Sequence, residues 1–307
     1  MQRVQNNRLS LEMPTKSFIH VLFDTIKIGI IKSNLIAMFA GLCMALYVEG
    51  VPFFDKIGTI ILAAVGSFLV IGSAGAFNNL YDRDIDSIME RTKGRPTVTG
   101  RVGTANGLFI AIWTAVLGLI ALYFASPLAA VFGFLGLFLY VVPYTIWTKR
   151  TTIYNTEVGS LSGAMPPLIG WAAISSDLTH SGALAIFMMM LVWQMPHFYA
   201  IAIRRMEEYR AAGIPMLPVV KGIRRTYVQM NVYLVALLLS SALFWPFSPV
   251  IAISNAVLSV WWLAMSVSGY RRKPEKKWAN AMFVFSLFHI TILMLGIIGF
   301  SLIRPLF

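Results

Sequence analysis

Asparagine and aspartate recur with helical spacing at the end of one long apolar run. Asn78, Asp82 and Asp86 are four residues apart, and Asp84 adds a third carboxylate within five positions. On a continuing helix the first three share one face, over roughly 12 Å of helix axis. Carboxylates this close raise one another's pKa unless positive charge lies between them. Magnesium fits, because it takes oxygen ligands and is often held by carboxylates plus substrate phosphates.

The competing interpretation of these acids is a solvated cap beyond a membrane helix. Acids near a membrane boundary are rare unless functional, and a cap does not explain why three of only 13 acidic residues fall together. A basic run with Arg91, Lys93 and Arg95 follows directly. Arg binds phosphate through a bidentate fork and Lys as a point charge. The pattern indicates a polyphosphate site, although each basic residue could instead only set membrane topology.

Two further groups of polar residues follow other apolar runs. Lys149 and Arg150 form one, and the other holds His197 inside a run with Arg204, Arg205 and Glu208 at its end. On a continuing helix Arg204 and Glu208 are i, i+4 partners. His197 is either hydrogen-bonded within the bundle, or acts as a metal ligand, a proton carrier or a contact to an acidic substrate group. We expect all three groups to share one cavity between helices.

The elements that position these residues are membrane spans. The chain is 58% hydrophobic and only 12% charged, whereas soluble domains carry about 25% charged residues. Runs of about 20 apolar residues are long enough to cross a bilayer. We predict an all-α integral membrane protein of about nine transmembrane helices, at Ile28–Val48, Gly58–Phe77, Thr104–Ala125, Pro127–Ile146, Glu157–Ile174, Gly182–Ile203, Val228–Phe247, Val250–Ser268 and Trp278–Ile303.

The distribution of basic residues predicts the orientation. Of the 25 Lys and Arg, 23 fall in alternate connections, and only Lys56 and Arg304 fall on the other side. The positive-inside rule then places the N-terminus in the cytoplasm and the C-terminus outside. The net charge of +12 is therefore a topology signal and does not predict nucleic-acid binding. We ascribe the last cluster, Arg271 to Lys277, to topology and contact with anionic lipid.

The sequence predicts one polytopic membrane domain over residues 1–307. Its cytoplasmic parts are an N-terminal segment, 1–27, and three active-site connections, 78–103, 147–156 and 204–227. The N-terminal segment is polar and lacks the apolar core of a cleavable signal. The single cysteine, Cys43, cannot form an intramolecular disulfide.

These residues resemble the UbiA-type intramembrane prenyltransferases. The resemblance is carried by Asn78-xxx-Asp82-xxx-Asp86, similar to the first diphosphate–magnesium motif of that superfamily, by Arg91, Lys93 and Arg95-Pro96, and by residues 144–152. Three later stretches resemble the heme-modifying branch: residues 155–159, residues 163–171 and the run from His197 to Val220. The resemblance covers essentially the whole chain.

The resemblance implies farnesyl diphosphate as donor, protoheme IX as acceptor, magnesium as cofactor and the lipid bilayer as surroundings. It assigns the metal to Asn78, Asp82 and Asp86. It gives catalytic roles to these three residues and to Lys149, Arg150 and Glu208. It assigns binding of the diphosphate to Arg91, Lys93, Arg95, Lys149 and Arg150. Many members carry a second Asp-xxx-Asp pair where this chain has Arg204-xxx-Glu208. Since arginine cannot ligate a metal, either this second site holds fewer magnesium ligands, or Arg204 binds the diphosphate or an acidic acceptor directly. Heme has two propionates, and our candidates for heme contacts are His197, Arg204 and Arg205. The family also implies handover of the product to a heme A synthase.

Three other functions compete with heme farnesylation. The first is a UbiA-type prenyltransferase with an aromatic or quinone-precursor acceptor. The second is a transporter, although the charged groups cluster at one membrane face instead of the midplane. The third is a heme-binding subunit without catalysis, which needs paired axial histidines. Of the histidines only His197 and His289 lie in predicted spans, and we expect them toward opposite faces.

Overall fold

The structure, a computed structural model, describes residues 17–303, and every element in that range is helical. Most of the N-terminal segment, with Arg3, Arg8 and Lys16, and Arg304 near the other end lie outside the described residues. The α-helices are α1 (Phe18–Ile26), α2 (Ile28–Glu49), α3 (Ile57–Tyr81), α4 (Arg83–Ile88), α5 (Thr104–Ala125), α6 (Pro127–Leu139), α7 (Lys149–Thr151), α8 (Asn155–Gly163), α9 (Met165–Ala172), α10 (Ser181–Arg204), α11 (Met206–Ala211), α12 (Leu217–Ser240), α13 (Pro249–Tyr270) and α14 (Glu275–Ile303). Two 3₁₀-helices, η1 (Phe53–Lys56) and η3 (Ser241–Phe244), and one π-helix, η2 (Tyr140–Thr148), join them.

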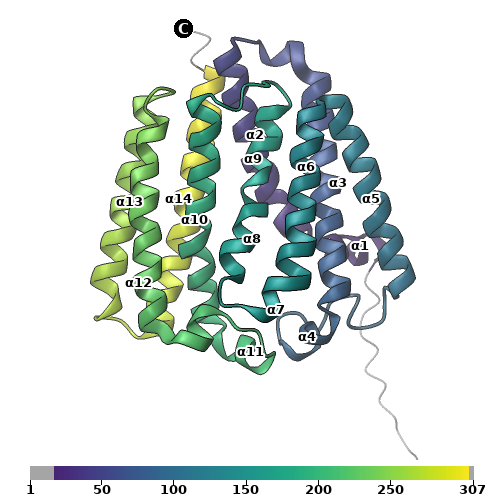
Figure 1. Cartoon of the computed structure of the whole chain (residues 1–307), viewed down its shortest axis with the longest axis vertical. Coiled ribbons are helices and arrows are strands. Elements are labelled where there is room, and N and C mark those ends of the chain that lie inside the picture. Colours follow the sequence, from purple (N-terminus) through teal and green to yellow (C-terminus); the bar gives the residue numbers. More distant parts are fainter. Residues whose placement is uncertain (1–16, 304–307) are drawn as a thin grey trace, which may run out of the picture.

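Eight helical segments are long and apolar enough to cross a membrane, and they stand side by side in one bundle (Figure 1). They are Ile28–Glu49, Phe53–Tyr81, Thr104–Ala125, Pro127–Thr151, Ser181–Arg204, Leu217–Phe244, Pro249–Tyr270 and Glu275–Ile303. Large apolar side chains such as Phe109 and Phe124 of α5 are exposed on the outside, because lipid tails are the solvent for that surface. The protein is a multi-pass membrane protein, as predicted.

The predicted fifth span consists of two short helices instead of one. Helix α8 ends at Gly163 and α9 begins at Met165. Pro166 and Pro167 fall in the first turn of α9, where the missing N–H of proline is tolerated, whereas both would disrupt the interior of a helix. The two helices follow one another along the height of the bundle, against α6 and α10 (Figure 1). The count of nine crossings therefore stays a prediction.

Helices α2 and α9 approach each other so closely that two positions require glycine. A Cβ atom on Gly170 would lie 1.8 Å from the carbonyl oxygen of Met38. One on Gly41 would lie 2.0 Å from the carbonyl oxygen of Pro167. No side chain fits these gaps. The contact therefore fixes α9, and through it the position of α8 beside the polar end of the bundle.

The short helices α4, α7 and α11 lie at the same end of the bundle, opposite the end of α14 (Figure 1). They belong to the connections 78–103, 147–156 and 204–227, which the fold therefore gathers at one end. Helix α12 begins earlier than the predicted seventh span, at Leu217, and passes a non-helical Gly222 with φ 76°. That this end faces the cytoplasm stays a prediction from charge.

Candidate active site

Asn78, Asp82 and Asp86 lie together at the junction of α3 and α4. The helix is interrupted at Asp82, whose φ and ψ are −87° and 8°. Backbone hydrogen bonds still run from Asp82 N to Asn78 O (2.9 Å) and from Asp86 N to Asp82 O (2.8 Å). The four-residue spacing therefore survives the break. All three side chains are buried, at 2%, 0% and 3% exposure, and Asn78 Nδ2 donates to Asp82 Oδ2 at 2.7 Å.

Basic side chains from two other segments pair with these carboxylates. The Lys149 ammonium, from the start of α7, donates to Asp82 Oδ2. The Arg150 guanidinium lies 3.6 Å from Asp82 Oδ1. The Arg95 guanidinium donates to Asp86 Oδ2. The site therefore alternates buried carboxylates with cations, a pattern in which charge-assisted hydrogen bonds are strong.

The third carboxylate of the motif, Asp84, has a different position. It accepts two hydrogen bonds of 2.7 Å from the Arg150 guanidinium, and its side chain is 63% exposed. These hydrogen bonds lower the pKa of Asp84 to about 2. Arg150 also lies over the Tyr81 ring, 4.8 Å from its centroid. Asp84 therefore orients Arg150 and does not join the buried pair.

Lys27 belongs to this cluster, although the sequence analysis treated it only as topology charge. It lies between α1 and α2 with φ 59°, a left-handed conformation that costs a non-glycine residue about 1–3 kcal/mol. Its ammonium donates to Asn78 Oδ1. Burial, with Arg95 and Lys149 nearby, holds the pKa of Lys27 well below its usual range. A single lysine before an apolar run carries no signal that could have identified it.

Thr145 is a second residue that the sequence analysis missed. Asn78 Nδ2 donates to Thr145 Oγ1 at 3.0 Å. Thr145 lies in the π-helix η2, which contains Pro143, and π-helical turns occur frequently at functional sites. The wide helix accommodates a proline, and Thr148 Oγ1 bonds the Pro143 carbonyl at 2.7 Å. Asn78 thus contacts Lys27, Asp82 and Thr145 at once.

Two basic residues predicted for the diphosphate lie outside this buried cluster. Lys93 pairs with Glu90 at 2.5 Å, with side chains 56% and 75% exposed. Arg91 is exposed as well. Of the basic run that follows α4, only Arg95 reaches a carboxylate of the motif.

The donor set of the cluster fits a divalent cation. Asp82 Oδ1 is buried and has no hydrogen-bond partner, whereas the Asn78 oxygen accepts from Lys27 and one Asp86 oxygen accepts from Arg95. No group of three or more His, Cys, Asp or Glu side chains in residues 17–303 is arranged to hold a metal. Magnesium needs only one or two carboxylates when waters and substrate phosphates complete its shell. The two buried carboxylates therefore suit it, while the Asn78 amide oxygen is bonded to the Lys27 ammonium.

The second polar group differs from the prediction in its pairing. Helix α10 ends at Arg204, and Arg205 separates it from α11. The expected pairing of Arg204 with Glu208 on a continuing helix is therefore wrong. Arg205 pairs with Glu208 at 2.6 Å, and the second carboxylate oxygen of Glu208 is buried without a partner. The Arg204 guanidinium instead lies over the Phe283 ring of α14, 4.3 Å from its centroid.

His197 lies between α10 and α14. Its Nδ1 is 2.6 Å from Ser286 Oγ, and its ring lies 5.3 Å from Phe283, the ring that also contacts Arg204. His289 follows Ser286 by one turn of α14 and contacts Ser259 Oγ at 3.4 Å. The two histidines therefore lie about one turn apart in depth, and the expectation that they point toward opposite faces is wrong.

The segments that carry the two polar groups are in apolar contact at one end of the bundle. The cavity found there is lined by residues of the second group, so a cavity shared by all the groups stays a prediction. Ile85 and Met89 of the α4 region pack with Ala202 of α10 and with Ile214 and Met216 beyond α11. These contacts and the placement of α4, α7 and α11 (Figure 1) close this end over the polar cluster.

Asn155 and Glu157, at the start of α8, connect this region further. Asn155 Nδ2 donates to the carbonyls of Thr152 (2.8 Å) and Pro215 (3.4 Å). Glu157 Oε1 accepts hydrogen bonds from Tyr199 and from Gln229, the latter at 3.1 Å. Both residues fall in the 155–159 stretch. The structure therefore gives that stretch a role in joining α8 to α10 and α12.

The fold and site are those of a helical membrane bundle with paired carboxylates and cations buried at one end. The chain belongs to the UbiA prenyltransferase family, whose sequence model matches residues 34–290. It is therefore a prenyltransferase.

Relatives and solved structures agree with that family. The chain is 61% identical to a protoheme IX farnesyltransferase of Shouchella clausii, over 97% of this chain and 96% of that protein. It is 58% identical to protoheme IX farnesyltransferase 1 of Bacillus cytotoxicus, over 94% of each. A UbiA homologue of Archaeoglobus fulgidus, solved with GPP and Mg²⁺, shares the fold with a TM-score of 0.67 at 13% identity, over 91% of this chain and 99% of that one.

Proposed function

We propose that this protein transfers a farnesyl group from farnesyl diphosphate to a vinyl group of protoheme IX, with addition of water, giving heme O and diphosphate. The observation that carries the proposal is 61% identity to a protoheme IX farnesyltransferase over nearly the full length of both chains. The buried carboxylate–cation cluster supports it, since an allylic diphosphate needs a site of this kind. We place the enzyme in the cell membrane, with a heme A synthase as the recipient of its product.

We assign Mg²⁺ to Asp82 and Asp86, whose side chains are buried, and to Asn78, whose oxygen would exchange the Lys27 ammonium for the metal. The bound ion would neutralise the diphosphate charge. The ammonium of Lys149 and the guanidinium groups of Arg95 and Arg150 line the same cluster. We assign them to the phosphate oxygens, with the Lys27 ammonium beside Asn78 in the same cluster and exposed Arg91 and Lys93 guiding the anion toward the site.

These cations act where negative charge grows during the reaction. The allylic C–O bond breaks, and the diphosphate leaves with the electron pair. Fixed positive charge at that point is usually the largest catalytic contribution. The heme vinyl electrons then form the new C–C bond, water adds to the resulting carbocation, and its proton passes to solvent. No enzyme nucleophile is required.

We assign the heme to the region of α10 and α14 that holds His197, Arg204 and Arg205. A cavity of about 230 Å³ lies at the end of α10, lined by three basic residues, Arg204, Arg205 and Lys276, and three acidic ones, Glu207, Glu208 and Glu275. It is smaller than a heme, so it would receive the propionates and not the macrocycle. Basic side chains at the bundle end suit the two propionates of heme.

Mass spectrometry of the reaction product tests the proposal. Purified protein is incubated with protoheme IX, farnesyl diphosphate and Mg²⁺, beside an Asp82→Asn variant. We expect hydroxyethylfarnesyl heme with the wild type and none with the variant. Folded protein that leaves heme unchanged but prenylates an aromatic or quinone-precursor acceptor would keep the family and refute the heme assignment. Transport of the substrates without any prenylated product would refute both.

A further inference from the structure

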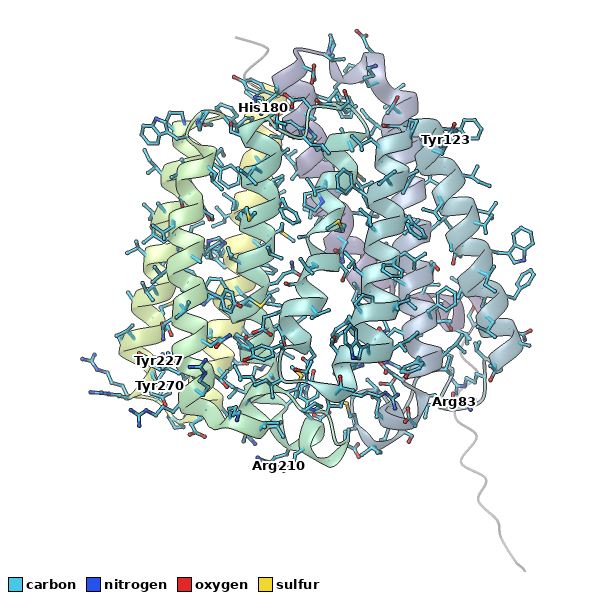
Figure 2. The ribbon with its side chains drawn as sticks, in the orientation of Figure 1. Arg83, Tyr123, His180, Arg210, Tyr227 and Tyr270 are labelled. Carbon is cyan, nitrogen blue, oxygen red and sulfur yellow. The ribbon has the colours of Figure 1, made fainter. Side chains whose placement is uncertain are left out.

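An open groove lies between α12 and α13, on the flank of the bundle away from Arg83 and the candidate active site. Figure 2 shows Tyr227 and Tyr270 on this flank, with Arg83 on the other. The groove has a volume of about 980 Å³ and runs from exposed apolar residues, Val228 and Val267, to the basic end of the bundle. None of its lining residues belongs to the candidate active site.

Three arginines converge on the polar end of this groove. Arg224 comes from α12, and Arg271 and Arg272 follow the end of α13. All three are exposed, and no acidic residue lines the groove. Within residues 17–303, no ion pair is formed by any of them. The groove therefore presents three positive charges that no ion pair within residues 17–303 neutralises.

Aromatic rings make the wall of the groove rigid. The rings of Tyr227 and Tyr270 stack with centroids 3.8 Å apart and an interplanar angle of 11°. Trp278 of α14 lies against both, at 5.9 and 5.3 Å, and its indole N–H donates to the Ser266 carbonyl at 3.2 Å. Tyrosine favours the level of lipid headgroups, because its ring is apolar and its hydroxyl is polar.

We propose that this groove binds one anionic phospholipid from the surrounding leaflet. The phosphate would be held by Arg224, Arg271 and Arg272, and an acyl chain would lie along Val228 and Val267. Basic residues that only set topology need not line the same groove. Here cations from two helices meet above an apolar channel, and basic pockets of this kind between membrane helices bind anionic headgroups.

Native mass spectrometry of the purified full chain tests the proposal. The probe is palmitoyl-oleoyl phosphatidylglycerol, with the phosphatidylcholine of the same chains as the neutral competitor. We expect one phosphatidylglycerol to bind preferentially. Joint replacement of Arg224, Arg271 and Arg272 by Gln should weaken it roughly tenfold or more. Replacing Lys221, Arg225 and Lys277 by Gln removes the same charge outside the groove and should leave binding within about twofold.

A second variant tests the groove without changing charge. Ala264 lines the groove and is exposed, so Ala264→Trp should fill it and reduce phosphatidylglycerol binding. Ala105→Trp, at an exposed position of α5, is the matched control. Circular dichroism of each variant confirms folding. Equal losses in the two Gln variants, equal binding of the two lipids, or unchanged binding in Ala264→Trp would each overturn the proposal.

Discussion

The ammonium of Lys27 donates a hydrogen bond to Oδ1 of Asn78, although the two residues are 51 positions apart. Asn78 uses its amide nitrogen for Asp82 and Thr145. One asparagine therefore couples the break before α2, the end of α3 and the π-helix η2. Replacing any partner should disturb the position of Asn78, and thereby of the metal site that we propose there.

Lys27→Met should lower kcat/KM for farnesyl diphosphate by about 10–100-fold, because the hydrogen bond that orients Asn78 in the proposed metal site is lost. Lys27→Arg should restore part of the activity. Steady-state kinetics at varied farnesyl diphosphate measure both. Lys32→Met, at an exposed position of α2, is the control. Equal activities of the Lys27 and Lys32 variants would show that Lys27 only sets topology.

The three acids of the motif should respond unequally to amidation. Asp82→Asn and Asp86→Asn should each lower turnover by about a hundredfold or more, since each removes a buried negative charge from the proposed metal site. Asp84→Asn should cost less than about tenfold, because an exposed ion pair with Arg150 contributes little. Product quantification by mass measures the order. A loss at Asp84 as large as at Asp82 would contradict this assignment.

Thr145→Val should raise the Mg²⁺ concentration for half-maximal activity by about 10–100-fold, the usual effect of removing a residue that orients a metal ligand. Thr145→Ser should rescue it, because the hydroxyl is retained. Thr114→Val is the control, since Thr114 bonds only the backbone of its own helix. An unchanged Mg²⁺ titration for Thr145→Val would rule out a role in positioning Asn78.

Arg204→Met should raise the KM for protoheme about tenfold through loss of a charge-assisted contact with a propionate. The KM for farnesyl diphosphate should stay the same. Arg210→Met is the control, since Arg210 pairs with exposed Glu207. Parallel kinetics with each substrate varied provide the measurement. A rise in the KM for farnesyl diphosphate alone would move Arg204 to the diphosphate site.

Gly170→Ala should destabilise the fold, because its Cβ would lie 1.8 Å from the Met38 carbonyl oxygen. Such overpacking costs typically about 1–3 kcal/mol, which thermal unfolding in detergent would detect as a lower midpoint. Gly299→Ala, which meets no atom within 4 Å, should leave the midpoint unchanged or raise it slightly. Equal midpoints for the two variants would show that α2 and α9 separate easily.

Local periodicity accounts for what the sequence predicted correctly. The four-residue spacing of Asn78, Asp82 and Asp86 placed them together, because backbone hydrogen bonds repeat every four residues even across the interruption at Asp82. The same periodicity failed for Arg204 and Glu208, where the break at Arg205 ends the helix and changes the pairing.

The sequence by itself determined the membrane bundle, its basic end and the position of the acidic motif, since each depends on residues close together in the chain. Only the tertiary structure decided that Lys27 and Thr145 join Asn78, that Asp84 orients Arg150, and that the fifth span is broken. Those features depend on contacts between distant segments, such as the approach of α2 to α9. Such contacts leave no periodic pattern in a single sequence.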